Sequence, residues 1–401
     1  MTCRFENRLA GQALEMRGLR GRYAAQARDE LPDVFAAIRR AQDQGCWTAL
    51  LLNYELGEWL EPDVNWSETP TTTACPADTP GPVAARDAPP RACLQDPRIT
   101  ALVYDQAVAA PVWPEPATSA AVGLHSRAST PRATYIHRVQ GLRASIARGE
   151  LYQANYTIRL ALDVDAPPRE LYRRIAAAHP SAHAAYIEDG ARRILSFSPE
   201  LFFERRGHTI TTRPMKGTAP RHPDLERDLR AARELQASEK NRAENVMIVD
   251  LLRNDLGRLA TPGSVSVDRL FALERYPSVW TLTSTISAQA PGHDLESLLR
   301  ALFPCGSVTG APKIAAMRKI RLMETAPRGI YCGSVGWLAP NGDCSLNVAI
   351  RTIEMHDDRH GVFGVGGGIV HDSDPELEWE ECLWKSRLLA TAPPGPARTS
   401  A

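Results

Sequence analysis

A single lysine stands between a β-prone run and a glycine in the stretch TRPMKGTAPR, residues 212–221. An amine can attack carbon and depart again once it is protonated, so Lys216 is a possible nucleophile. A free lysine amine is mostly protonated at neutral pH, and this chemistry therefore needs a neighbour that takes the proton or favours the neutral form. A solvated lysine in a surface turn is the alternative, and the stretch alone does not decide between the two.

Glu244 is a candidate ligand for a cation. It belongs to the run SEKNRAENVMIVDLLRNDLGR at residues 238–258, for which we predict a helix. On that helix it shares a stripe with Ile248 and Leu251, which is unusual for a carboxylate unless the stripe faces a polar site. A charged face that contacts only solvent is the alternative.

The last predicted helix, over 375–390, carries two glutamates and a lysine on one face. In DPELEWEECLWK, Asp374 is the expected N-cap, and Glu378, Glu381 and Lys385 follow at i, i+3 and i+7. A hard cation such as Mg²⁺ needs one or two carboxylates and keeps water or substrate oxygens as its other ligands. Two helices that each offer glutamates could meet that need, although the spacing alone does not show that they do.

Glu200 and two glycine-containing turns are further candidates. Glu200 lies in FSPELFF, flanked by apolar residues on a predicted hairpin. The runs VGGGIV (365–370) and CGSVTGAPK (305–313) expose backbone N–H groups that could approach an anion, or are simple turns. Neither run has the GxGxxG spacing, so a dinucleotide fold is not supported.

The elements around these residues suggest mostly antiparallel sheet. A helix is expected from Pro131 to about Gly149, followed by a strand over 152–160 whose polar face carries Gln153 and Asn155. That polar face could meet solvent or line a polar cavity. Because the later strands come in neighbouring groups with short turns, hairpins are favoured over βαβ alternation. Further strands are expected at 193–198, 201–206, 208–214, 331–339, 344–355 and 361–370, and further helices near 169–178, 223–257, 294–303 and 312–324.

Composition indicates a soluble globular protein. The chain has 401 residues, of which 43% are hydrophobic and 23% charged, and Lys+Arg equals Asp+Glu at 47 each. This balance gives no basic field for nucleic acid, and no apolar run is long enough for a membrane span. The eight cysteines show no metal-finger spacing and suit reduced thiols, so we expect a cytoplasmic location.

Proline content divides the chain. Eleven of the 31 prolines fall between residues 62 and 116, and we predict a loop or partly disordered insert at 66–98. The expected organisation is a short N-terminal part at 1–128, a catalytic region at 129–391 and a frayed tail at 392–401.

Taken together, the motifs resemble those of the chorismate-utilising enzymes, the family of anthranilate synthase, aminodeoxychorismate synthase, isochorismate synthase and salicylate synthase. The resemblance covers about residues 130 to 390. It implies an α+β fold, an anthranilate-synthase-like α/β/β/α sandwich with two packed antiparallel sheets. It rests on SPELFF, TRPMKGTAPR, EKNRAENVMIVDLLRNDLGR, GSVTGAPKIAAM, YCGSVGW, AIRT and GGGIVHDSDPELEWEECLWK.

The resemblance also implies roles for individual residues of a chorismate site. The implied catalytic residues are Lys216 and Glu200, the latter as general acid/base beside the ring. The implied metal ligands are Glu244, Glu378 and Glu381, which would hold Mg²⁺ against a chorismate carboxylate. The implied substrate-binding residues are Gly217, Thr218, Tyr331, Arg351, Gly366, Gly367, Gly368 and Lys385.

Two positions favour the aminodeoxychorismate synthases within the family. Anthranilate synthases resemble this motif but carry alanine where Lys216 stands, whereas aminodeoxychorismate synthases carry the lysine, thought to add at C2 of the ring. Isochorismate and salicylate synthases place a water-activating lysine where this chain has Gln153, which cannot act as a base. The implied reaction converts chorismate and ammonia to 4-amino-4-deoxychorismate for p-aminobenzoate and folate synthesis. An anthranilate synthase component I and a catalytically silent scaffold copy are the alternatives.

The resemblance implies a partner as well. No cysteine–histidine glutaminase arrangement is recognisable, so ammonia is expected from a separate glutamine amidotransferase subunit. The resemblance includes no lyase region, so the product is expected to stay aminodeoxychorismate. One position departs from the pattern, because Thr281 stands where many relatives carry a histidine.

Overall fold

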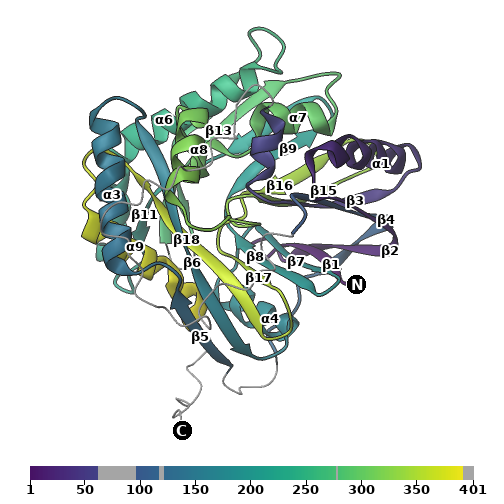
Figure 1. The fold of residues 1–401 in the computed structure, drawn as a ribbon, viewed down its shortest axis with the longest axis horizontal. Coiled ribbons are helices and arrows are strands. Elements are labelled where there is room, and N and C mark those ends of the chain that lie inside the picture. The colour runs from purple at the N-terminus through teal and green to yellow at the C-terminus, as the bar shows by residue number, and fades with distance from the viewer. Residues whose placement is uncertain (62–95, 117–121, 277–278, 392–401) are drawn as a thin grey trace.

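The computed structural model describes residues 1–61, 96–116, 122–276 and 279–391 (Figure 1). The predicted insert at 66–98 therefore falls outside the described residues except for its last three positions, and the predicted tail at 392–401 falls outside entirely. None of the described helices combines the length and apolar character that a membrane crossing requires. The six cysteines in the described ranges are free and buried.

The described strands form one hydrogen-bonded network in which every neighbouring pair is antiparallel. The network folds into two layers. In order from its outer edge, the first layer contains β5 (Gly123–Ala128), β6 (Gln153–Asp165), β18 (His360–Ile369), β17 (Thr352–Met355), β8 (Arg192–Ser198), β7 (His183–Asp189) and β1 (Cys3–Asn7), with β14 (Gly310–Ala311) beside β6.

The second layer continues from β1 through the long strand β2. The two N-terminal strands β1 and β3 are each paired with a strand from much later in the chain, β7 and β15. The second layer contains β2 (Gln12–Ala25), β4 (Ile99–Pro111), β3 (Trp47–Leu52), β15 (Ser334–Leu338), β16 (Cys344–Asn347), β9 (Leu201–Arg206), β10 (Thr209–Arg213) and β13 (Val279–Gln289), with β11 (Met215–Pro220) beyond β10 along β13 and β12 (Ser266–Arg275) at the edge.

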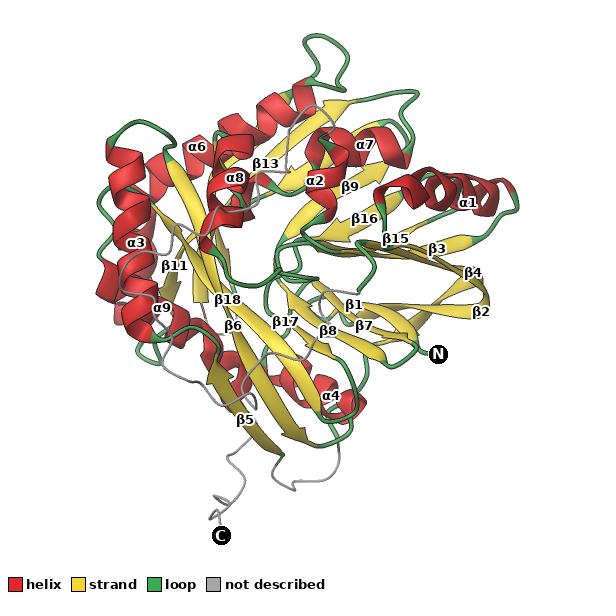
Figure 2. Ribbon diagram, viewed as in Figure 1, coloured by secondary structure: helices red, strands yellow, loops and turns green. Residues whose placement is uncertain are grey.

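Helices cover the outer face of each layer (Figure 2). One set packs on β6, β18 and β8, the other on the second layer. The first set is α3 (Arg132–Ala147), α4 (Pro168–Ala178), α8 (Lys313–Met323) and α9 (Pro375–Lys385). The second is α1 (Leu31–Asp43), α2 (Leu56–Leu60), α5 (Leu225–Ala237), α6 (Glu239–Gly257) and α7 (Leu295–Leu302).

Three buried clusters hold these layers together. One lies under each set of helices, and the third lies between the sheets, where Met16, Leu51, Leu102, Ile187 and Val335 meet. Apolar burial on this scale is the main favourable contribution to folding. The arrangement confirms the predicted α+β class and the α/β/β/α sandwich. The division at residue 128 stays a prediction.

Three element predictions were wrong in detail. The predicted helix over 223–257 is two helices, because the Ser238 hydroxyl accepts from Asn241 N and begins a new helix there. The predicted strand at 331–339 begins only at Ser334, and the predicted strand at 344–355 is divided into β16 and β17. The polar face of β6 meets neither open solvent nor an exposed edge, since Gln153 and Asn155 are both buried.

The predicted hairpin around Glu200 was also wrong. β8 pairs with β7 and β17, whereas β9 pairs with β10 and β16, so the chain passes from one layer to the other at Pro199–Glu200. The break between β16 and β17 is the matching passage in the other direction, and Val348 N donates to Glu200 O across it at 3.0 Å. Two neighbouring crossings thus bring loop residues to the space between the sheets.

Candidate active site

Lys216 stands in a β-bulge. In the ladder between β11 and β13, Met215 pairs with Thr283 and Thr218 with Thr281, so Lys216 and Gly217 together face the single residue Leu282. Gly217 has φ +84°, a value that glycine adopts easily. A bulge of this kind bends the strand and re-aims a side chain. The Lys216 amine points across to β18, and a Cβ placed on Gly368 would lie 3.5 Å from its Nζ.

Glu200 lies close to that amine, at the crossing between β8 and β9. Its side chain is buried, and its Oε1 has no hydrogen-bond partner among the described residues. Burial raises the pKa of Glu200 to about 7, although the Ser307 hydroxyl and the Lys216 charge act in the opposite direction. A carboxyl group that titrates near neutral pH is suited to give and take protons. The structure therefore supports an acid/base role beside the amine.

Gln153, at the start of β6, is fully buried, and neither of its amide atoms has a hydrogen-bond partner within the described ranges. Its amide faces Gly368, as the Lys216 amine does. Burying an amide without hydrogen-bond partners costs free energy. The Gln153 donor and acceptor are therefore candidate partners for a group that binds here. The polar face of β6 thus lines the same space as Lys216.

The glycines of β18 allow side chains to approach the strand from two sides. A Cβ on Gly366 would overlap Tyr156 O and Thr157 on the neighbouring strand. A Cβ on Gly367 would lie 3.0 Å from Glu378 Oε2 and 3.8 Å from both Glu381 Oε1 and Lys385 Nζ. The backbone of Gly367 therefore faces the charged groups of α9 directly.

The charged face of α9 is confirmed. Asp374 accepts from Leu377 N and caps the helix. Lys385 Nζ lies 2.6 Å from Glu381 Oε1 and donates to Gly366 O at 2.6 Å, and Ser373 Oγ donates to Glu378 Oε1 at 2.7 Å. The carboxylates of Glu378 and Glu381 thus lie beside the backbone of β18, and Lys385 contacts both Glu381 and that backbone.

The pKa values of the two carboxyl groups of α9 are shifted in opposite directions. Burial, with a smaller effect from Glu381, raises the pKa of Glu378 above its usual range. Partial desolvation acts in the same direction on Glu381, whose side chain is half exposed, but Lys385, Lys216 and Lys240 outweigh it and lower the pKa of Glu381. The charge of Lys216 thus lowers the pKa of both Glu200 and Glu381.

Glu244 lies on α6, half-buried, and no described residue forms an ion pair or hydrogen bond with its carboxylate. Lys240 stands one turn earlier on the same face, and it acts electrostatically on Glu378 and Glu381. This face of α6 therefore turns toward α9. The three predicted metal ligands do not converge on one point among the described side chains, because only Glu378 and Glu381 are brought together at Gly367.

The structure also places three other predicted substrate-binding residues, Tyr331, Arg351 and Thr218. Tyr331 is buried, and its ring fills the place that a Cβ on Gly364 would take. Arg351 has φ +51°, at the crossing between β16 and β17, and burial lowers the pKa of its guanidinium. None of the described carboxylates pairs with it, so it can receive an anion. Thr218 is exposed, and the structure gives its side chain no contact with the amine.

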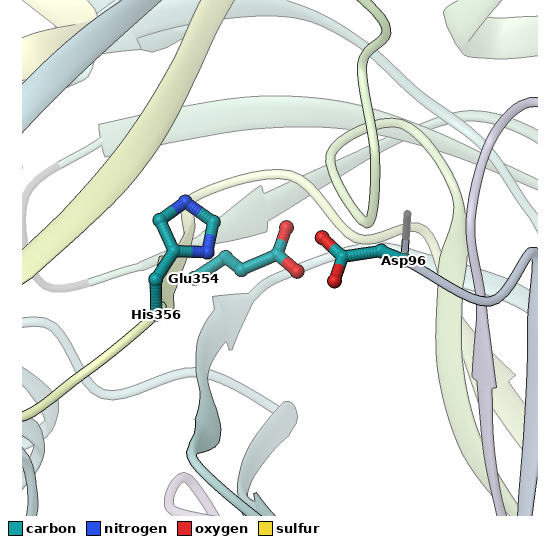
Figure 3. A group of neighbouring side chains, drawn as sticks. All are labelled: Asp96, Glu354 and His356. Carbon is teal, nitrogen blue, oxygen red and sulfur yellow. The ribbon is translucent and has the colours of Figure 1, made fainter. Parts of the chain in front are cut away.

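Sequence reasoning missed two features. Ser307, in a short 3-10 helix at Gly306–Val308, contacts Glu200, and only its presence in the motif CGSVTGAPK hinted at a role. Asp96, Glu354 and His356 bring three ligand atoms within 4.8 Å of one another, with the two carboxyl groups face to face (Figure 3). Arg192 Nε already lies 2.5 Å from Glu354 Oε1, so a buried cation compensates this second group. No sequence motif joins these residues.

Comparison with known proteins assigns the family. The model of the chorismate binding enzymes matches residues 9–391. This chain belongs to that family. Among curated proteins it is 43% identical over 267 residues to anthranilate synthase component 1 of Streptomyces coelicolor, an alignment covering 66% of this chain and 52% of the relative. It is 39% identical over 293 residues to aminodeoxychorismate synthase component 1 of Klebsiella aerogenes, covering 71% and 65%.

Solved structures of the family share the fold. An anthranilate synthase component I from Streptococcus pneumoniae superposes with a TM-score of 0.71 at 25% identity, covering 86% of this chain and 80% of that one. A putative 2,3-dihydroxybenzoate-specific isochorismate synthase, DhbC from Bacillus anthracis, superposes with a TM-score of 0.74 at 19% identity, covering 97% and 95%. The curated relatives are longer, since this chain aligns with about half to two thirds of their length.

Proposed function

We propose that the protein is the chorismate-converting subunit of an aminodeoxychorismate synthase, which combines chorismate with ammonia to give 4-amino-4-deoxychorismate. The observation that carries this proposal is the Lys216 amine, aimed by a bulge at Gly368 and lying near the partly unpaired carboxyl of Glu200. Relatives with this activity match at 38–41% identity. An ammonia-supplying glutamine amidotransferase subunit is the proposed partner, and p-aminobenzoate and folate synthesis the proposed use of the product.

In the proposed reaction the neutral Lys216 amine forms a bond to C2 of the chorismate ring. The ring double bonds shift, and the C4 hydroxyl leaves as water with a proton from Glu200. Ammonia then forms a bond to C4, the double bonds shift back, and the C2–nitrogen bond breaks to release Lys216. Glu200 takes a proton back in this second half, so the carboxyl returns to its starting state.

The carboxylates of α9 fit a magnesium ion. Glu378 and Glu381 present hard oxygen donors beside Gly367, and the charge of Glu381 contributes to the raised pKa of Glu378. We propose that they hold Mg²⁺ together with Glu244 on the facing helix. When bound, the ion would neutralise a substrate carboxylate. Lys385, Arg351 and Tyr331 are the proposed partners for the remaining acidic and hydroxyl groups of the substrate.

Gln153 is proposed to favour ammonia over water as the added group. An amide cannot remove a proton from water, but its oxygen can accept from an amine and its nitrogen can donate to a substrate oxygen. Its two unpaired atoms beside Gly368 supply both functions. This favours nucleophiles such as ammonia, which attack carbon without first losing a proton to a base.

Anthranilate synthesis is the second candidate, because the Streptomyces coelicolor relative with that name matches at 43% identity. One assay separates the candidates. The protein is incubated with chorismate, Mg²⁺ and ammonium, and a lyase is then added to convert any aminodeoxychorismate to p-aminobenzoate. Appearance of p-aminobenzoate supports the proposal, fluorescent anthranilate without the lyase contradicts it, and unchanged chorismate favours a silent scaffold.

Glu381→Gln should weaken the binding of Mg²⁺ and with it the Mg²⁺-dependent activity. The amide keeps the shape but removes a charged oxygen, and loss of even an outer partner of a metal ligand typically costs about 10–100-fold in affinity. The Mg²⁺ concentration that gives half-maximal chorismate consumption should therefore rise at least about tenfold. Glu376→Gln is the matched control, since Glu376 is exposed on the same helix and pairs with Arg132. Equal Mg²⁺ curves for the two variants would place the metal elsewhere.

A further inference from the structure

The bulge that presents Lys216 is held from β13 by a side chain. Thr281 Oγ1 donates to Gly217 O at 3.1 Å, and Thr281 itself has no solvent exposure. Its pairing partner is Thr218, the first residue after the bulge, so the hydroxyl reaches back one residue along β11. The bond therefore holds the carbonyl of the Gly217–Thr218 peptide, which is the second peptide after the lysine.

The regular strand ladder does not continue through this stretch. On the other side of the lysine, Ser284 N donates to Pro214 O at 3.2 Å. Between Met215 and Thr218 the regular ladder is interrupted, which is where an extra residue leaves strand groups unpaired. Glycine at this position can rotate freely between conformations, because it has no Cβ. The Asn241 side chain packs against Gly217, but it gives no hydrogen bond to the peptide.

Orientation of this peptide matters for the amine. The Lys216 side chain is long and has several rotatable bonds, so the direction in which it leaves the strand decides whether Nζ stays near Gly368 and Glu200. A shift of about 1 Å in a reacting group can reduce a rate by about a hundredfold. The Thr281 hydroxyl can act on this direction through its bond to Gly217 O.

We propose that Thr281 is a positioning residue for Lys216, which holds the Gly217 carbonyl so that the amine is directed at the bound ring. The inference rests on the proposed function in so far as Lys216 is the nucleophile. It assigns a role to the position at which this chain departs from the histidine of many relatives. Thr281 would thus affect where the Lys216 amine lies, and not its nucleophilicity.

The test compares three variants of the full chain. Thr281→Val keeps the shape and loses the hydroxyl, whereas Thr281→Ser restores the hydroxyl. Thr283→Val is the matched control, because Thr283 is also buried on β13 and donates instead to Ala272 O of β12 at 3.4 Å. For each protein we would measure kcat and KM for chorismate, thermal unfolding, and the rate at which an amine-reactive reagent labels Lys216, followed by peptide mass spectrometry.

The expected result is a kcat for Thr281→Val at least about tenfold below wild type, with KM changed by less than about twofold. Labelling of Lys216 should become faster in this variant, since the amine spends more time away from Gly368 and Glu200. Thr281→Ser should restore both quantities. Thr283→Val should resemble wild type in kcat and labelling, even where it unfolds at a lower temperature.

Equal losses of kcat in Thr281→Val and Thr283→Val, or wild-type labelling in Thr281→Val, would overturn the inference. If Thr281→Val does not fold, Thr281→Ala against Thr281→Ser makes the same comparison. Labelling needs no turnover, so it is independent of which product the enzyme makes. A wild-type protein that forms anthranilate, with labelling still sensitive to Thr281, would refute the proposed function and leave the positioning role standing.

Discussion

Lys216→Ala should abolish formation of 4-amino-4-deoxychorismate, with kcat at least about a thousandfold below wild type. The proposed path forms a bond between the lysine nitrogen and C2, and no other described amine is aimed at Gly368. A covalent step that is lost cannot be replaced by better binding, because the lysine contributes to the transition state and not only to the ground state. The measurement is p-aminobenzoate formed in the lyase-coupled assay, together with anthranilate fluorescence.

A second lysine provides the control for this experiment. Lys319 lies on α8 and forms a surface ion pair with Glu150 at 3.1 Å. Lys319→Ala removes the same group from the surface, where such pairs contribute about 0–1 kcal/mol, and turnover should stay near wild type. Small amounts of a C2-amino product from the Lys216 variant would fit direct attack by ammonia. Full turnover in that variant would exclude a nucleophilic lysine.

Glu200→Gln should reduce kcat by about 10²–10⁴-fold, the usual contribution of a general acid or base. Because the pKa of Glu200 is about 7, the wild-type enzyme should lose proton donation as the pH rises through 7, and the variant should lack this limb of the profile. Rates measured from pH 6 to pH 9 test this. Glu204→Gln is the control, since Glu204 is a partly exposed carboxylate on β9 and its removal should keep the profile. An unchanged profile in Glu200→Gln would reject the role.

The same buried carboxyl should also link stability to pH. Its native pKa is raised by burial, so between about pH 4.5 and pH 7 the native state keeps a proton that the unfolded chain releases. The free energy of unfolding of the wild type therefore falls, relative to Glu200→Gln, as the pH rises through this range, and the gap stays constant above it. Between pH 5 and pH 8 the change should be about 2 kcal/mol. Urea unfolding at both pH values measures it.

Local sequence signals identified most of the candidate site residues. Asp374 could be recognised as an N-cap, and the spacing of Glu378, Glu381 and Lys385 placed them on one helix face without any structure, because helical geometry is local. The two sheets and outer helices followed from the family resemblance. The Lys216 amine was singled out from its neighbours in sequence; in the structure it lies beside Gly368, and its role stays a proposal.

Long-range pairing decided what sequence could not show. A run such as Gln153–Asn155 looks the same whether its polar side meets solvent or a cavity, because the strands that cover it come from distant segments. The passage of the chain between layers at Glu200 depends on which strands pair, not on the turn itself. The bulge at Lys216 is defined by the pairing of β11 with β13, and the sequence of β11 alone does not show it.

The pairing of β1 with β7 and of β3 with β15 has a consequence for any attempt to isolate the catalytic region. Cutting the chain before Ser129 would remove β1, β3 and β5, and it would leave unpaired backbone groups along β7, β15 and β6. It would also remove Met16, Leu51 and Leu102 from the packing between the sheets. Such a fragment should aggregate when expressed, so the proposed site residues depend on the N-terminal strands for a folded scaffold.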